Sequence, residues 1–200
     1  MKYEYEILEQ EQLYKGFLTI DRYRLRHRLF AGGWSEALVR ERVQPLRASS
    51  VLLYDPQLDE VVLIEQFRIG ALESDGHPWL LEIIGGHIGE GETPEDVARR
   101  ESLEEAGCEV LDLVPICEFL VTPGTSGERN YLYCARVDAS RAGGIHGIAE
   151  EGEDIRVERM KFATAMAEVY GGSINSTTGI MAMQWLALNR GQLQQRWKTA

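Results

Sequence analysis

Four glutamates near the middle of the chain are spaced so that they could hold a divalent cation. They lie in residues 86–108, GHIGEGETPEDVARRESLEEAGC, as Glu92 followed by Glu101, Glu104 and Glu105. On a helix each residue turns by about 100°, so the last three share one arc. Their like charges repel, and the end of a helix disfavours anions. A divalent cation would remove both penalties, and hard oxygen ligands suit Mg²⁺ or Mn²⁺.

The residues around this arc predict the helix that carries it. Thr93 is a good N-cap, Pro94 suits the first helical position, and Gly107 supplies a stop. Small side chains let a helix backbone lie close to a sheet, which would hold the arc at the sheet edge. They form the neighbouring stripe of this helix: Ala98, Ser102 and Ala106.

Two further features beside the arc bear on a metal site. Gly85, next to Gly86, lets the backbone approach closely, so a carbonyl there could be another ligand. Arg100 could form an ion pair with a motif glutamate and fix its rotamer. The alternatives are a surface arginine and an acidic helix face that is only solvated.

The N-terminal part of the chain predicts a small antiparallel sheet. Residues 15–30 and 34–43 alternate loosely between apolar and polar types, and a Gly-Gly turn separates them. A sheet of this size is too small to be stable alone, so it needs the main domain or a second subunit as a partner. We divide the chain into an N-terminal β-sheet and dimerisation subdomain, 1–47, and a second domain, 48–200.

The second domain reads as strands followed by helices. Continuous apolar runs at 49–55 and 60–68 are typical of buried strands. The Gly-rich acidic segment 140–154 is predicted to be a loop. The pattern predicts an α/β fold, an α/β/α sandwich with a mixed sheet. Further strands are expected at 114–123, 130–138 and 155–162, and helices at 162–172 and 177–197.

Composition limits the classes of partner. The 200 residues carry a formal charge of −11, which does not suit binding to a nucleic-acid backbone. No secretory signal and no membrane-spanning run is visible, so no membrane partner is expected. The three cysteines cannot all pair, and reduced thiols in a cytoplasmic protein are the expectation.

The motif in residues 86–108 resembles the signature of the Nudix hydrolases, which cut nucleoside diphosphates linked to another group. The resemblance implies that Glu101 and Glu105 are metal ligands, that Glu104 contributes in some members, and that Glu92 supports the loop before the helix. Ser102 departs from the pattern, which usually has an apolar residue or alanine there. Its hydroxyl can bond a carbonyl one turn back, so this departure does not speak against activity.

Other segments resemble the bacterial ADP-ribose pyrophosphatase subfamily of enterobacterial type. They include VVLIEQFRIGA, PWLLEIIGGHI, GERNYLY and GIHGIAEEGEDIRVE. The implied reaction is Mg²⁺-dependent hydrolysis of ADP-ribose to AMP and ribose 5-phosphate. The resemblance also places the catalytic base and a further metal contact on the acidic loop that holds Glu151 and Glu153. We favour Glu151 as the base and Glu153 as the metal ligand, and the reverse stays open.

Three residues are candidates for binding the substrate. Arg68 would meet the phosphates, since a guanidinium grips them with two bonds. Glu128 could accept a hydrogen bond from ribose or adenine, and Trp34 could stack on adenine. For each, a structural or surface role is the alternative. His87 and His146 have no metal-ligand spacing and are interpreted as loop histidines.

The subfamily resemblance implies a homodimer whose N-terminal sheets exchange or pack across the two-fold axis, placing residues near Trp34 in the partner's active site.

Three other functions remain open. The chain could hydrolyse another nucleotide sugar, such as GDP-mannose or ADP-glucose. It could bind a nucleotide without cutting it, although all four motif glutamates are present. The charge speaks against a third, RNA-processing role.

Overall fold

The computed structural model describes two stretches of the chain, residues 3–73 and 76–198, without the side chain of Glu151. No helix within these stretches has both the length and the apolar character needed to cross a bilayer. The three cysteines are free thiols, and burial separates them: Cys108 and Cys134 are buried, whereas Cys117 is exposed.

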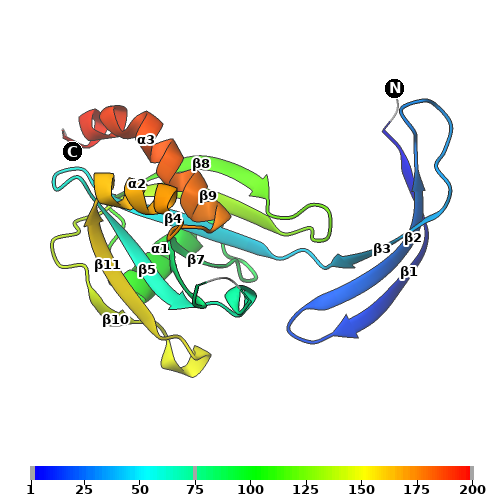
Figure 1. Cartoon of the computed structure of the whole chain (residues 1–200), viewed down its shortest axis with the longest axis horizontal. Helices are drawn as coiled ribbons and strands as arrows, with labels where there is room; N and C mark the ends of the chain where they lie inside the picture. The colour runs from blue at the N-terminus through cyan, green and yellow to red at the C-terminus, as the bar shows by residue number, and fades with distance from the viewer. Residues whose placement is uncertain (1–2, 74–75, 199–200) are drawn as a thin grey trace. The chain divides into compact units, whose positions relative to one another are not determined.

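The chain folds into two units (Figure 1). The N-terminal unit holds residues 1–46 and also 120–129, and the motif unit holds residues 47–119 and 130–200. The segment 120–129 therefore groups with the N-terminal unit, although it follows a strand of the motif unit in sequence.

The N-terminal unit is built on an antiparallel sheet in the order β1–β2–β3. Its buried residues on β2 include one acidic and one aromatic side chain, Asp21 and Tyr23. The buried carboxylate of Asp21 accepts hydrogen bonds from the Tyr23 hydroxyl at 3.2 Å, from Gln10 at 3.1 Å and from Gln44 at 3.0 Å. The strands are β1 (Tyr5–Lys15), β2 (Thr19–His27) and β3 (Leu38–Val43).

Strand β1 was not predicted from the sequence, because its run of Glu and Gln has low strand propensity. All eleven of its residues are exposed, so burial does not explain it. Ion pairs with arginines on β2 do, since opposite charges facing each other across strands stabilise a sheet. The pairs between these strands are Glu6–Arg26, Glu9–Arg24 and Glu11–Arg22, and Glu4–Arg28 adds a fourth just beyond the strand ends.

The motif unit contains one large sheet in the order β10–β11–β5–β4–β9–β8, with β6 on β5 and β7 on β4. Its printed pairs β4–β5, β5–β11 and β4–β7 are antiparallel. Strand β9 runs parallel to β4, because the amides of Arg129 and Val137 donate to Leu46 and Tyr54, so that both chains advance together. The sheet is therefore mixed, as predicted. Its strands are β4 (Arg47–Asp55), β5 (Glu60–Phe67), β6 (Trp79–Glu82), β7 (Ile84–His87), β8 (Asp112–Leu120), β9 (Arg129–Arg136), β10 (Gly144–His146) and β11 (Ile155–Lys161).

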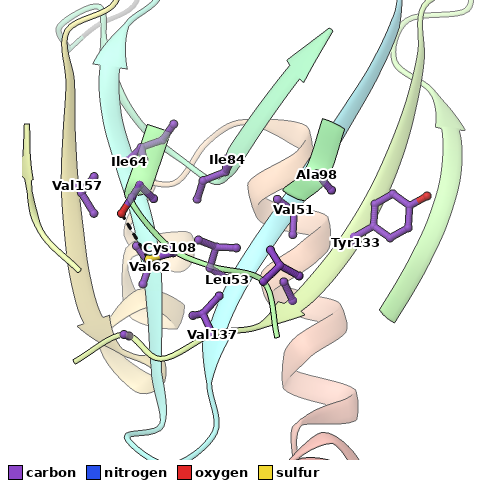
Figure 2. Close-up of a cluster of buried hydrophobic side chains, with 14 of the residues drawn as sticks. Val51, Leu53, Val62, Ile64, Ile84, Ala98, Cys108, Tyr133, Val137 and Val157 are labelled. Atoms are coloured by element: carbon purple, nitrogen blue, oxygen red, sulfur yellow. Dashed lines mark hydrogen bonds between the residues drawn. The ribbon is translucent and has the colours of Figure 1, made fainter. Parts of the chain in front are cut away.

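Helices cover both faces of this sheet, which confirms the predicted α/β/α sandwich. On one face lies α1 (Pro94–Ala106), whose Ala98 packs with Val51, Leu53, Val62 and other strand residues (Figure 2). On the other face lie two helices that bury Leu52, Leu63 and Trp197 among others. They are α2 (Phe162–Gly171) and α3 (Thr177–Lys198), and short 3₁₀ turns occupy Ile69–Ala71 and Ala149–Glu151.

Candidate active site

The helix that carries the motif begins and ends as its sequence predicts. Thr93 accepts a hydrogen bond from the amide of Asp96 at 3.2 Å, and the Asp96 carboxylate accepts one from the amide of Thr93 at 3.0 Å. This reciprocal capping box fixes the first turn, with Pro94 at the first helical position. Gly107 ends the helix in the left-handed region, at a φ of 62°. The helix is therefore a rigid support for its glutamates.

The stripe of small residues lets this helix lie on the sheet. Ala98, Ser102 and Ala106 are buried, and the Ser102 hydroxyl donates to the Ala98 carbonyl at 2.6 Å, which confirms the expected bond one turn back. The approach is closest at Gly86, where a Cβ would overlap the carboxylate of Glu101. A larger residue at this position would therefore force the Glu101 side chain to move.

Glu105 is the most deeply placed of the motif carboxylates. Only 2% of the residue is exposed, and its Oε2 accepts a hydrogen bond from the amide of Gly85 at 3.0 Å. Burial raises the pKa of Glu105 to about 8, and the carboxylates of Glu101 and Glu153 also raise it. Without a cation, the folded protein therefore tends to keep this carboxyl protonated at neutral pH.

Arg100 binds three of the motif glutamates at once. Its Nε lies 3.0 Å from Glu92, and its Nη1 lies 2.8 Å from both Glu101 and Glu104. Glu92 also accepts from the amide of Gly89 at 2.8 Å, and the bonds from Arg100 and then Gly89 lower the pKa of Glu92. The predicted ion pair of Arg100 is thus present, and it joins the loop before the helix to the helix itself.

Arg68 directly follows strand β5. Its charge is close enough to the motif cluster to lower the pKa of Glu105, although burial has the larger, opposite effect. The Nε of Arg68 donates to Glu82 at 2.7 Å, and the Glu82 side chain is only 12% exposed. The sequence analysis missed Glu82. The signal that could have identified it is a single charged residue inside the apolar run 79–84, just before Gly85.

The acidic loop of the motif unit brings Glu153 to the cluster. Glu153 raises the pKa of both Glu101 and Glu105, after the larger effect of burial on each. Its Oε2 accepts from the amide of Ile148 at 3.0 Å, which holds the carboxylate within the loop. The side chain of Glu151 lies outside the described residues, so the choice between the two glutamates as the base stays a prediction.

The remaining two candidates lie in the N-terminal unit. Trp34 is half-buried, and the guanidinium carbons of Arg26 and Arg28 lie 4.9 Å and 4.4 Å from its ring centroid. An adenine stacked on this ring would share or displace those groups. Glu128 is half-buried in the segment 120–129, where its amide donates to Ser126. Their membership of the site stays a prediction.

The donor set of the motif unit fits a divalent cation of the Mg²⁺ or Mn²⁺ type. The carboxylates are oxygen ligands, and Glu105 has an anionic form that burial penalises and that a cation would stabilise. Among residues 3–73 and 76–198, no three Asp, Glu, His or Cys side chains already converge in a geometry that could hold a metal. Arg100 holds Glu101 and Glu104 instead, so loading would require those carboxylates to turn.

Known proteins match this chain over most of its length. Residues 44–173 match the model of the NUDIX domain. The ADP-ribose pyrophosphatase of Escherichia coli (strain K12) is 46% identical over 196 residues, covering 98% of this chain and 94% of that protein. The GDP-mannose pyrophosphatase of Cronobacter sakazakii is 36% identical over 143 residues, covering 70% and 73% of the two chains.

The fold is also similar to a solved structure. The crystal structure of an ADP compounds hydrolase superposes with a TM-score of 0.74 and covers 96% of this chain and 97% of its own. The two sequences are 20% identical, so this likeness concerns the fold alone.

Proposed function

The chain belongs to the Nudix hydrolase family, and from this premise we propose that it hydrolyses the pyrophosphate bond of ADP-ribose, with Mg²⁺, to give AMP and ribose 5-phosphate. The choice of ADP-ribose as the substrate rests on the 46% identity to an ADP-ribose pyrophosphatase over nearly the whole of both chains. The carboxylate cluster around Glu105 supports the chemistry, because it offers oxygen ligands beside the Arg68 guanidinium.

We assign the metal ligands to Glu101, Glu105, Glu153 and the carbonyl of Gly85, with Glu104 as an additional contributor. When bound, Mg²⁺ would neutralise the pyrophosphate and lower the pKa of the attacking water. Buried Glu105 supports this assignment, since a carboxylate that costs free energy alone is stabilised by a cation.

Other residues of the motif unit would orient the metal ligands and the substrate and activate the attacking water. Arg100 would release Glu101 and Glu104 to the cation and keep Glu92 in place, because its Nε pairs with Glu92 separately. Arg68 would grip the phosphates while Glu82 holds its guanidinium. Glu151 would take the proton of the attacking water, with Glu153 as the alternative base.

We propose that Trp34 stacks on adenine and that Glu128 accepts a hydrogen bond from ribose or adenine, with residues near Trp34 serving the active site of the partner subunit. The active form would be a cytoplasmic homodimer that pairs through the N-terminal sheet. Exposed apolar side chains on that unit support the presence of a partner surface, because exposed apolar patches often mark sites of protein–protein interaction. They include Tyr5, Ile7, Tyr14, Phe17, Phe30 and Val39.

A substrate panel with Mg²⁺ tests the proposal. ADP-ribose, ADP-glucose, GDP-mannose and other nucleoside diphosphate sugars are compared by kcat/KM, with sedimentation measuring the oligomeric state. ADP-ribose should rank among the best substrates. A clear preference for another nucleotide sugar would make the substrate assignment wrong while keeping the reaction class.

One alternative has its own support. The 36% identity to a GDP-mannose pyrophosphatase makes that nucleotide sugar the second candidate. A role as a non-catalytic sensor predicts instead a stable, uncleaved complex when ADP-ribose and Mg²⁺ are added together. Calorimetric titration followed by analysis of the nucleotide separates the two outcomes.

A further inference from the structure

His146 connects the acidic loop to the motif helix. It is the last residue of β10 and pairs in register with Ile155 of β11, so its interpretation as a loop histidine was wrong, as it was for His87 at the end of β7. Residues 147–154 between these strands form the loop that carries Glu153. The β10–β11 pairing therefore attaches both ends of the loop to the sheet, and the side chain of His146 adds a contact to α1.

The imidazole ring packs against the end of α1. A Cβ on Gly107 would lie 2.8 Å from the ring Cε1, so the ring touches the helix C-cap directly. Its Nε2 lies 3.0 Å from the carbonyl oxygen of Gly143. A carbonyl can only accept, so Nε2 donates in this bond and the orientation of the ring is fixed.

The next two residues extend this contact toward the catalytic carboxylate. The amide of Gly147 points at the Glu104 carbonyl in the last turn of α1, at 3.4 Å. Gly147 has a φ of 101°, and a Cβ there would lie 2.7 Å from the Cβ of Glu153. The amide of Ile148 then donates to the Glu153 carboxylate at 3.0 Å. Three consecutive residues thus relate the helix end to Glu153.

The ring is a second attachment of the loop to the helix, beside the bond from Gly147. A hydrogen bond of 3.4 Å is long and weak, whereas ring packing against a fixed cap resists displacement. We propose that His146 is a positioning residue for hydrolysis: its ring holds loop 147–154 on the C-terminal turn of α1 and so keeps Glu153 beside Glu101 and Glu105. This inference rests on the proposed function, because it assigns Glu153 to the reaction.

Replacement of the ring tests the proposal in the metal-free protein first. In His146→Ala, hydrogen exchange of the Gly147 and Ile148 amides should accelerate by at least about tenfold, because the loop opens locally. Mn²⁺ affinity, followed by electron paramagnetic resonance, should fall in the same variant. Ile145→Ala is the matched control, since Ile145 lies on the same strand and is 66% exposed. It should change neither measurement by more than about twofold.

Turnover gives the second measurement. With Mg²⁺ and ADP-ribose, His146→Ala should lower kcat by about 10- to 100-fold and change KM much less, because a misplaced loop carboxylate harms the transition state more than binding.

Two results would overturn the proposal: unchanged exchange and Mn²⁺ affinity in His146→Ala, or equal losses in Ile145→Ala. If His146→Ala does not fold by circular dichroism, His146→Gln replaces it, because it removes the ring and keeps an N–H for Gly143. A wild-type protein that does not cleave ADP-ribose contradicts the proposed function instead. The exchange and Mn²⁺ comparisons still decide the positioning role in that case.

Discussion

The two units of this molecule use glutamate in opposite ways. In the N-terminal unit each glutamate of β1 faces an arginine across the sheet, and both partners stay in water; the Glu9 side chain, for example, is 69% exposed. In the motif unit one arginine serves Glu92, Glu101 and Glu104, and Glu105 is buried. Paired, solvated charges support a fold, whereas a buried carboxylate without a bound cation costs free energy and serves binding.

The largest expected effect tests the buried member of this comparison. Glu105→Gln should lower kcat with ADP-ribose and Mg²⁺ by more than about 100-fold, since the loss of a ligand should exceed the losses caused by the groups that support ligands. Glu95→Gln, on the exposed side of the same helix, and Glu9→Gln should stay within about threefold of the wild type. Near-normal turnover in Glu105→Gln would end its assignment as a ligand.

The second prediction concerns pH and the metal-free protein. The pKa of Glu105 is about 8 when folded and 4.5 ordinarily, so between these values the folded state holds a proton that the unfolded chain has lost. The free energy of unfolding should therefore fall as the pH rises from 5 to about 8, by about 1.4 kcal/mol per unit of pKa difference at most.

Urea unfolding in the presence of a chelator measures this slope. Glu105→Gln cannot titrate, so its stability should fall less over the same range and should equal or exceed that of the wild type at pH 8. Added Mg²⁺ should stabilise the wild type at pH 8 more than the variant. Parallel pH profiles for the two proteins would contradict the pKa assignment.

The third prediction concerns Trp34 in the N-terminal unit. Trp34→Ala should raise KM for ADP-ribose by about three- to tenfold, the size expected for one lost aromatic stacking contact, and should lower kcat less. Steady-state kinetics on the two substrates ADP-ribose and GDP-mannose would show whether the loss follows the adenine base. An unchanged KM would remove Trp34 from the adenine site.

The smallest effect tests the solvated pairs. Arg24→Ala breaks the pair with Glu9, whose atoms are 3.0 Å apart, and should cost only about 0.2–1 kcal/mol of unfolding free energy. The cost should shrink in 1 M NaCl, because salt screens exposed charges. A loss as large as that from a buried group would break the contrast between the units.

Much of the motif unit could be predicted from the sequence because its signals are local. The cap at Thr93, the stop at Gly107 and the buried stripe through Ser102 follow from residue type and helical spacing. The separation of Glu105 from its neighbours did not follow, since the spacing placed it in one arc with Glu101 and Glu104. Burial depends on the sheet that packs against the helix, which no local pattern reveals.

The features that were not predicted from the sequence also depend on contacts between residues in different elements. Strand β1 exists because its glutamates meet arginines on β2, a fact of register rather than of propensity. Glu82 and His146 matter through contacts with Arg68 and Gly107, both distant in sequence. The position of segment 120–129 also depends on contacts, such as the bond from the amide of Val43 to Thr125. Each needs a three-dimensional neighbour before its role is visible.

The parallel pairing of β4 with β9 also determines the order in which this molecule can assemble. It joins distant segments, as in the bond between Asn130 and Ser50, which are 80 positions apart. Closing so long a loop costs chain entropy before any contact rewards it, so this step should be slow, whereas the β1–β2 hairpin can close within microseconds. On a ribosome, the hairpin can therefore begin to pair while the sheet beneath the motif helix still lacks β9.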